Sequence, residues 1–231
     1  MSGIVLKLIA ILTMAIDHIG LVNDLFYFRV IGRIAFFLFA FMIAEGVVYT
    51  RDIKKYLMRL LLFAFISDPF FDIFFYTSSG NPFELSQKAF FDLSHQNVMF
   101  TLFFGALACV LVEKLWNSED KKEKVVLSIG IVVTFAISMV SNQDYGMVGT
   151  AMVLFFYMAR NSFNAQAIVV ITFAIILYYF NAELLLGAVS SLIFIKLYNG
   201  NKGTFGNKTV DFAFQLFTYI FYPLHLLLLS I

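Results

Sequence analysis

The sequence lacks several features that would point to a secreted, disulfide-bonded or nucleic-acid-binding protein. Its one cysteine, Cys109, lies in an apolar run and excludes an internal disulfide. The net charge is only +1, so no strong electrostatic field favours nucleic acid as a partner. The N-terminus has no basic region before its apolar stretch and no small-residue cleavage site after it. We therefore expect a retained first span rather than a signal peptide.

Two further absences bear on function. The sequence shows no internal repeat, so an inverted-repeat transporter gains no support from that test. The chain has three histidines, and none has the i,i+4 spacing of a metalloprotease helix. Three histidines and several carboxylates can make a zinc site, but without that spacing we expect no metal.

Apolar residues dominate what is present. They make up 61% of the chain, against about 45–50% in soluble domains, and the mean hydropathy is +0.87. Apolar runs that approach the roughly 20 residues of a membrane span occur at 4–22, 30–49, 57–75, 97–115, 125–141, 145–160, 166–181, 183–199 and 210–230. We predict one all-α integral-membrane domain over residues 1–231, a transmembrane bundle of about nine spans, with eight or ten as alternatives.

The runs 145–160 and 166–181 are only 16 residues long. They are candidates for half-helices, or for segments that pack against protein rather than lipid.

The basic residues set an expected direction in the membrane. With the spans above, 13 of the 16 fall on one side, which the positive-inside rule assigns to the cytoplasm. Only Arg29, Arg33 and Lys88 fall on the other side. We therefore expect a cytoplasmic N-terminus.

Lys7 and His18 lie in the first apolar run with ten residues between them. On a helix they share one face and stand about 16 Å apart. An ionisable residue inside a span is costly, so it is a functional candidate by default. Asp17 cannot share the face of His18, and we expect it to form an ion pair with Arg33 of the next span rather than to touch the imidazole. The alternative is a structural polar pair that joins helices.

Other polar residues are expected at the outer ends of the spans. Asp68 and Asp72 share a helix face around Pro69. Three interpretations are open for them: exposure to solvent at the helix edge, a paired acid site, or an ion pair with Arg33. Asp144 is an interfacial residue or a carboxylate that orients His18, a role for which Asp68 and Asp72 also qualify. His225 is a snorkelling cap on the last span or part of the same site.

A basic group is expected at the inner side, where Lys7 would be joined by Arg51, Lys54, Lys55 and Arg59. Lysine and arginine bind phosphates, and arginine does so bidentately. The group is therefore a candidate site for the phosphates of a cytosolic ligand. Its alternative role is to orient the protein and contact anionic membrane lipids.

Several segments together resemble a known family. They are MAIDHIG (14–20), IGRIAF (31–36), AEG (44–46), YLMRL (56–60), NVMFTL (97–102), DYG (144–146) and YPLHL (222–226). The spacing of Lys7 and His18 resembles the basic residue, ten-residue gap and histidine of the acyltransferase type 3 superfamily. Within it, the chain is most similar to the TraX family, which has a member that acetylates the N-terminus of pilin.

The resemblance implies a transferase of the bacterial plasma membrane. It would move an acetyl or other small acyl group from cytosolic acetyl-CoA to an amine or hydroxyl at the outer side. The acceptor would be a secreted peptide, a pilin N-terminus or an envelope glycan. His18 would be the base or would carry an acyl intermediate, and Arg33 would stabilise the oxyanion.

Two other classes of function stay open. A proton-coupled transporter or exporter would use the buried Asp, His and Arg residues as a relay, and it has no reason to bind CoA. A non-catalytic assembly or immunity protein would tolerate the loss of Lys7 and His18.

Overall fold

The computed structural model describes residues 1–78 and 95–230, and the regular elements in this part of the chain are all helices. Lys88, which we expect on the outer side, lies outside the described residues. The predicted all-α fold is therefore confirmed for the part of the chain that the structure describes.

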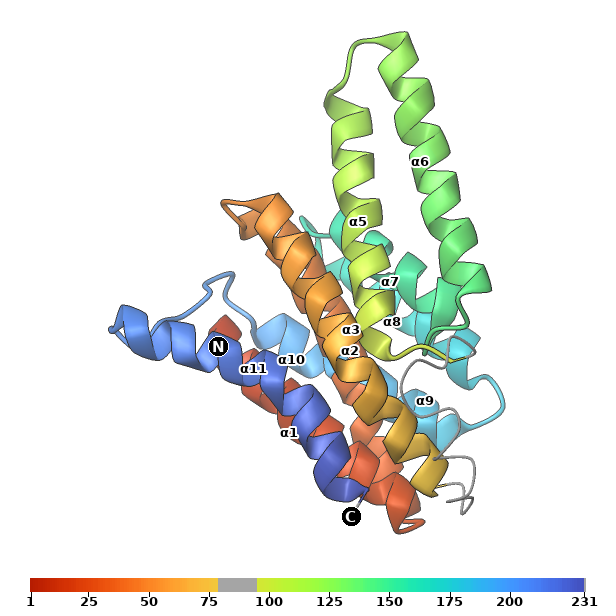
Figure 1. Ribbon diagram of the computed structural model, residues 1–231, viewed down its shortest axis with the longest axis vertical. Coiled ribbons are helices and arrows are strands. Elements are labelled where there is room, and N and C mark those ends of the chain that lie inside the picture. Colours follow the sequence, from red (N-terminus) through yellow and green to blue (C-terminus); the bar gives the residue numbers. More distant parts are fainter. Residues whose placement is uncertain (79–94, 231) are drawn as a thin grey trace.

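Helices α1 (Gly3–Val22) and α2 (Phe26–Tyr49) form a tight hairpin, and α2 runs through the centre of the bundle (Figure 1). α2 contacts α1, α5, α7, α9 and α10. Its buried residues are mostly apolar, and Arg33 is the buried charge among them. A central helix that is surrounded by other helices has to be apolar on nearly every face, and this sequence is.

Helix α3 (Ile53–Ser78) and the last long helix, α11 (Lys208–Leu229), pack against each other, and α11 also contacts α1. The first and last long helices of the sequence are therefore neighbours, with α1 in contact with both α2 and α11 (Figure 1). This arrangement brings residues more than 200 positions apart into one site.

Helices α5 (Val98–Asn117) and α6 (Lys121–Val140) form a second hairpin, which projects from the bundle in Figure 1. Most of α6 is exposed, and its exposed side chains are largely apolar, including Val126, Val132 and Val140. Exposure of this apolar face to water is unfavourable, whereas contact with lipid is favourable.

The remaining helices are short. They are α7 (Gly146–Met158), α8 (Phe163–Tyr178), α9 (Ala182–Val189) and α10 (Ser191–Leu197). The shortness that we predicted for the runs 145–160 and 166–181 is confirmed. The apolar run 183–199 forms two short helices, α9 and α10, which meet at Ser190. The hydroxyl of Ser190 donates to the carbonyl of Leu186 at 2.8 Å, a back-bond that competes with regular helix geometry.

Five described helices are long and apolar enough to cross a membrane, namely α1, α2, α5, α6 and α11. The protein is a membrane protein. The total number of spans and the cytoplasmic position of the N-terminus stay predictions.

Candidate functional site

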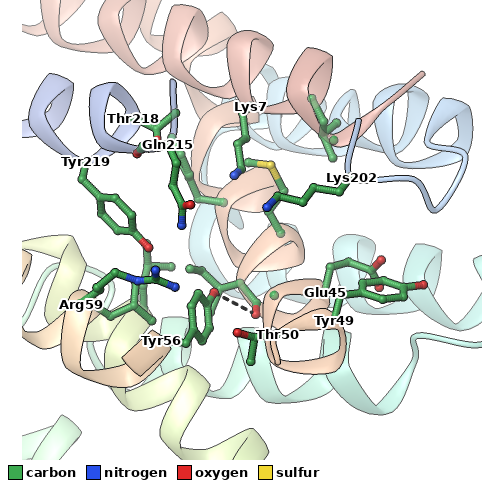
Figure 2. Close-up of a pocket in the computed structure, with 18 of the residues that line it drawn as sticks. Lys7, Glu45, Tyr49, Thr50, Tyr56, Arg59, Lys202, Gln215, Thr218 and Tyr219 are labelled. Atoms are coloured by element: carbon green, nitrogen blue, oxygen red, sulfur yellow. Dashed lines mark hydrogen bonds between the residues drawn. The ribbon is translucent and has the colours of Figure 1, made fainter. Parts of the chain in front are cut away.

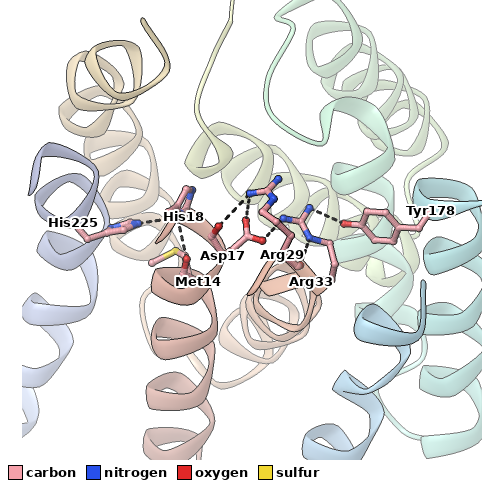
Figure 3. Close-up of polar contacts among 7 residues, drawn as sticks. All are labelled: Met14, Asp17, His18, Arg29, Arg33, Tyr178 and His225. Carbon is pink, nitrogen blue, oxygen red and sulfur yellow. Dashed lines mark hydrogen bonds and ion pairs between the residues drawn. The ribbon is translucent and has the colours of Figure 1, made fainter. Parts of the chain in front are cut away.

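His18 and His225 meet where the C-terminal ends of α1 and α11 come together (Figure 3). Nε2 of His225 is 3.0 Å from Nδ1 of His18. Both residues are candidates from the sequence, but nothing in the sequence pairs them. The structure pairs them because α11 packs against α1.

The contacts of the two rings define one consistent set of protons. Nδ1 of His225 is 2.8 Å from the carbonyl of Phe221, so this nitrogen is the donor and Nε2 of His225 is left as an acceptor. Nδ1 of His18 is 3.0 Å from the carbonyl of Met14, so it too is a donor, shared between Met14 and His225. Nε2 of His18 then carries a lone pair, and no described residue forms a hydrogen bond with it. An imidazole in this state can accept a proton at Nε2.

Aromatic rings fix the orientation of the histidine pair, His18 and His225. The Phe74 ring meets His18 edge to face, with centroids 5.4 Å apart. The Phe221 ring stacks on His225 at 5.0 Å. His225 is buried and His18 is partly buried. Packed rings of this kind hold an imidazole in one rotamer, which a base needs if its lone pair is to keep one direction.

Asp17 faces away from the histidine pair and forms two ion pairs with α2 (Figure 3). Its carboxylate contacts the Arg33 guanidinium, and its other oxygen lies 2.9 Å from Nη1 of Arg29. The predicted pairing of Asp17 with Arg33 is confirmed. We call Asp17, Arg29 and Arg33 the carboxylate–guanidinium cluster.

Arg33 has further partners. Its Nε donates to the carbonyl of Arg29 at 3.1 Å, and Nη1 lies 3.4 Å from the hydroxyl of Tyr178 in α8. The guanidinium therefore joins α1, α2 and α8 at one level of the bundle.

Gly32 explains how a carboxylate comes so close to the backbone of α2. A Cβ atom at Gly32 would lie 2.1 Å from Oδ1 of Asp17 and 2.2 Å from its Cβ. Any larger residue would push α1 away and separate Asp17 from both arginines. The Gly-Arg pair at positions 32–33 thus provides both the space and the charge for the ion pair.

The other predicted acids lie on neighbouring elements. Asp68 of α3 is buried, and its Oδ1 accepts from Nδ2 of Asn97 at 2.7 Å and from the Asn97 amide at 3.3 Å. Because Asn97 also caps the start of α5, these described contacts of Asp68 join α3 to α5. Asp72 is buried one turn further along α3.

Asp144 lies in the turn before α7, where its amide donates to the carbonyl of Gln96 at 2.8 Å. Burial raises the pKa of the Asp144 carboxyl, and the charges of His95 and Arg33 oppose this rise. Nδ1 of His18 is oriented by the Met14 carbonyl and by a second imidazole, that of His225.

At the other end of α1 lies a cavity of about 380 Å³ (Figure 2). Gly3, Leu6, Lys7 and Ile11 of α1 line it, so the cavity follows this helix toward His18. His18 lies seven positions after Ile11, which is about 10 Å along the helix axis.

Three cations line this cavity: Lys7, Arg59 and Lys202. In Figure 2 their charged groups point into it, with Tyr56 and Tyr219 beside Arg59. None of the three forms an ion pair with a described carboxylate, and Nε of Arg59 is buried without a hydrogen-bond partner. We call this site the cationic cavity.

The structure brings together only two of the five basic residues that we expected at one site. Lys7 and Arg59 line the cavity, whereas Arg51, Lys54 and Lys55 do not. These three are exposed, at or just before the first turn of α3. Arg59 lies about one helical turn further along, on the face that also carries the buried residues Tyr56 and Leu60. Lys55 has a surface partner in Asp52, 3.1 Å away, and its backbone amide and ammonium lower the pKa of that carboxyl.

Glu45 lines both the cationic cavity and a second cavity of about 390 Å³, which also has Arg160 and Lys196 in its wall. It lies beside Tyr198, which is shared by the two cavities. The Glu45 side chain forms no ion pair among the described residues.

Sequence reasoning missed two residues of these sites. Arg29 was taken only as a charge on the outer side, although it lies one helical turn before Arg33 and therefore on the same face. Lys202 was counted only as an orientation signal. It lies in a loop, so helix periodicity could not place it on the same face as Lys7. In residues 1–78 and 95–230, no three His, Cys, Asp or Glu side chains are placed to hold a metal ion.

Comparison with known proteins gives a consistent family. The sequence profile described as "TraX protein" matches residues 2–231. The chain is 28% identical to "Probable fimbrial assembly protein FimC, serogroup H1" of Dichelobacter nodosus, over 99% of this chain and 94% of that protein. No solved structure matches. With the profile matched along essentially its whole length, the chain belongs to the TraX family.

Proposed function

We propose that this protein is a membrane-embedded acyltransferase that moves an acetyl group from acetyl-CoA to an amine or hydroxyl acceptor. The observation that carries the proposal is the arrangement along α1. One end of this helix presents Lys7 to a cavity whose cations form no ion pair with a described carboxylate, and the other presents an imidazole whose Nε2 has no described partner.

The cationic cavity fits the phosphate end of the donor. Coenzyme A carries several phosphates, and unpaired cations in a partly enclosed site bind phosphate more strongly than exposed ones do. Among the described residues of the wall, Glu45 is the one carboxylate, so the three cations dominate the charge of the cavity. The apolar residues Leu6, Ile11 and Leu102 line the same cavity and suit a flexible arm.

The acyl arm has to pass beyond Ile11 to bring its thioester to His18, a further distance of about 10 Å. Met14 lies on this stretch of α1, and Met99 lines the cavity. Methionine side chains are flexible and adapt to a ligand at low cost. We propose that the arm follows α1 past these two side chains.

At the histidine pair, Nε2 of His18 takes the proton of the attacking amine or hydroxyl. The acceptor forms a bond to the thioester carbonyl carbon, the C–S bond breaks, and the proton passes from His18 to the leaving thiolate. His225 accepts from Nδ1 of His18 and so supports the positive charge that develops on the ring.

Arg33 acts as a positioning residue in this scheme. Its guanidinium already contacts Asp17, the Arg29 carbonyl and Tyr178. These contacts favour a role in which Arg33 holds α1 in place. They favour it more than the stabilisation of the oxyanion that we expected from the sequence.

The acceptor is proposed from the family. The TraX match and the relative named as a fimbrial assembly protein support an acceptor in a pilus or fimbria, such as the amine of a secreted subunit. The resemblance to the acyltransferase type 3 superfamily supports the same reaction class. With the predicted orientation, CoA would stay on the cytoplasmic side of a bacterial plasma membrane while the acceptor is modified at the outer side.

A transporter is the second candidate, and the interruption of α9 and α10 at Ser190 favours it. Broken helices in transporters surround the substrate. Neither α9 nor α10 supplies a residue to the histidine pair or to the carboxylate–guanidinium cluster, so we rank this function second.

The test is acetyl transfer by purified protein in lipid nanodiscs, with radiolabelled acetyl-CoA and a peptide that has a free N-terminal amine. We expect labelled peptide with wild type and none with His18→Ala. The matched control is His95→Gln, which changes a histidine outside the pair. Saturable CoA binding without transfer to any amine or hydroxyl would contradict catalysis, and absence of CoA binding would favour the transporter.

A further inference from the structure

The segment between α10 and α11 is fixed to the start of the chain. The amide of Gly3 donates to the carbonyl of Asn201 at 2.8 Å, and the amide of Ile4 donates to the carbonyl of Lys202 at 3.1 Å. In the other direction, Asn199 donates to the carbonyl of Met1 at 3.0 Å. The first amides of a helix have no partner within the helix, and here the 199–202 segment supplies it. Lys202 is therefore held by its backbone at the N-terminal end of α1.

Gly203 lets the segment come this close. Its φ is +77°, in the left-handed region, and a Cβ atom there would lie 2.8 Å from Cβ and Oγ of Ser2. A residue with a side chain would be strained in its backbone and would collide with the start of the chain. The position of Lys202 is thus set by the two segments together.

The three cations of the cavity differ in depth. Lys7 and Arg59 are partly buried, and Nε of Arg59 is fully shielded. Lys202 is exposed, on the loop that forms one edge of the cavity. Lys202 and Arg59 both lie within electrostatic range of Lys7, and all three side chains line the same cavity. An anion with charges at two depths fits this arrangement better than a single phosphate.

We propose that Lys202 binds the 3′-phosphate of the donor nucleotide, while Lys7 and Arg59 bind its diphosphate. This assignment rests on the proposed function. In coenzyme A the diphosphate joins the acyl-bearing arm to the ribose, and the 3′-phosphate lies on the far side of it. An arm that points along α1 toward His18 places the diphosphate at the two inner cations and the 3′-phosphate at the exposed one.

The experiment compares two ligands that differ only in that phosphate. Equilibrium binding of CoA and of 3′-dephospho-CoA is measured on the full chain in zwitterionic nanodiscs. We expect wild type to bind CoA about tenfold more tightly, the effect of one charge-assisted contact. Lys202→Ala should lower CoA affinity about tenfold and leave 3′-dephospho-CoA affinity unchanged, so that the preference disappears. Lys202→Arg should keep the preference for CoA over 3′-dephospho-CoA. Lys208→Ala should keep it too, because Lys208 is exposed and lies outside the cavity.

The outcomes separate this inference from the function on which it rests. A Lys202→Ala protein that still prefers CoA tenfold would overturn the assignment and leave the donor site in place. Wild type that binds neither ligand would overturn both. A third measurement uses nanodiscs that contain phosphatidylglycerol. If this lipid abolishes the preference of wild type for CoA over 3′-dephospho-CoA, Lys202 binds an anionic headgroup and the assignment fails.

Discussion

The two ends of α1 present their charges in opposite ways. At one end, Asp17 is paired with Arg29 and Arg33, and His18 is bonded to Met14 and His225. At the other end, Lys7, Arg59 and Lys202 surround a cavity and have no ion pair with a described carboxylate. The first set is closed by contacts within the protein, and the second is open to a ligand.

This difference separates the residues that hold the helices together from the residues that are placed to bind a ligand. Removing one partner from a closed set leaves a buried charge alone, so the cost falls on the folded state. Removing one cation from an open set relieves repulsion among like charges, so the cost falls on ligand binding. His18 belongs to both sets, because Nδ1 is hydrogen-bonded within the protein whereas Nε2 has no described partner. The variants below test this comparison, beginning with the largest expected effect.

The largest effect is expected for His18→Ala, which removes the proposed base. The transfer rate should fall by about 10²–10⁴-fold, the usual contribution of general base catalysis. CoA affinity should stay within about twofold, because the cationic cavity is about 10 Å from the imidazole. The check is steady-state kinetics beside CoA titration. A variant that keeps most of the wild-type rate would disprove the role of His18.

Asp17→Asn should strongly destabilise the protein, because it leaves Arg29 and Arg33 without their carboxylate. Breaking a buried pair costs about 3–5 kcal/mol, and the partial exposure of Arg29 places the expected loss near the lower value. The measurement is thermal unfolding in detergent. Asp52→Asn is the matched control, since its pair with Lys55 is exposed and its loss should not shift the transition. Equal effects of the two variants would refute the comparison.

His225→Phe keeps a ring that can stack on Phe221 but removes the nitrogen that accepts from His18. We expect kcat to fall about tenfold with KM for acetyl-CoA unchanged, because one charge-assisted hydrogen bond to the developing imidazolium is lost. His225→Gln, which restores an acceptor, should recover part of the rate. A merely structural role would give no such recovery.

Lys7→Ala and Arg59→Ala should each weaken CoA binding about tenfold, through the loss of one phosphate contact. Neither should lower the unfolding temperature, because neither side chain has a described ion-pair partner. Lys54→Ala serves as the control, since Lys54 is exposed and does not line the cavity. If Lys54→Ala weakened binding as much as Lys7→Ala, the binding would reflect general surface charge.

The smallest effect is expected for Gly203→Ala, which disturbs the contact between the 199–202 segment and Ser2. CoA affinity should fall a few-fold as Lys202 is displaced. Gly206→Ala is a matched control, because its φ is also positive, at +79°, but a Cβ there has open space. Both variants carry the same backbone strain, so a difference in CoA affinity between them isolates the contact with Ser2.

Much of the fold followed from local pattern. Long apolar runs predicted α1, α2, α5, α6 and α11, because a membrane span is specified by length and composition alone. The helix break at Ser190 was not predicted, since one serine in an apolar run gives a weak signal. The pairing of Asp17 with Arg33 was predictable because the two residues lie on consecutive helices joined by a short turn.

By itself, the sequence determined the membrane class, the family resemblance and the alignment of Lys7 with His18. These depend on hydropathy, on motifs and on the fixed geometry of one helix. Only the tertiary structure decided that His225 partners His18, that Lys202 joins Lys7 and Arg59, and that Arg51, Lys54 and Lys55 stay outside the cavity. Those choices depend on how α3, α11 and the 199–202 segment pack in the bundle, and contacts between distant segments leave no periodic signal in a single sequence.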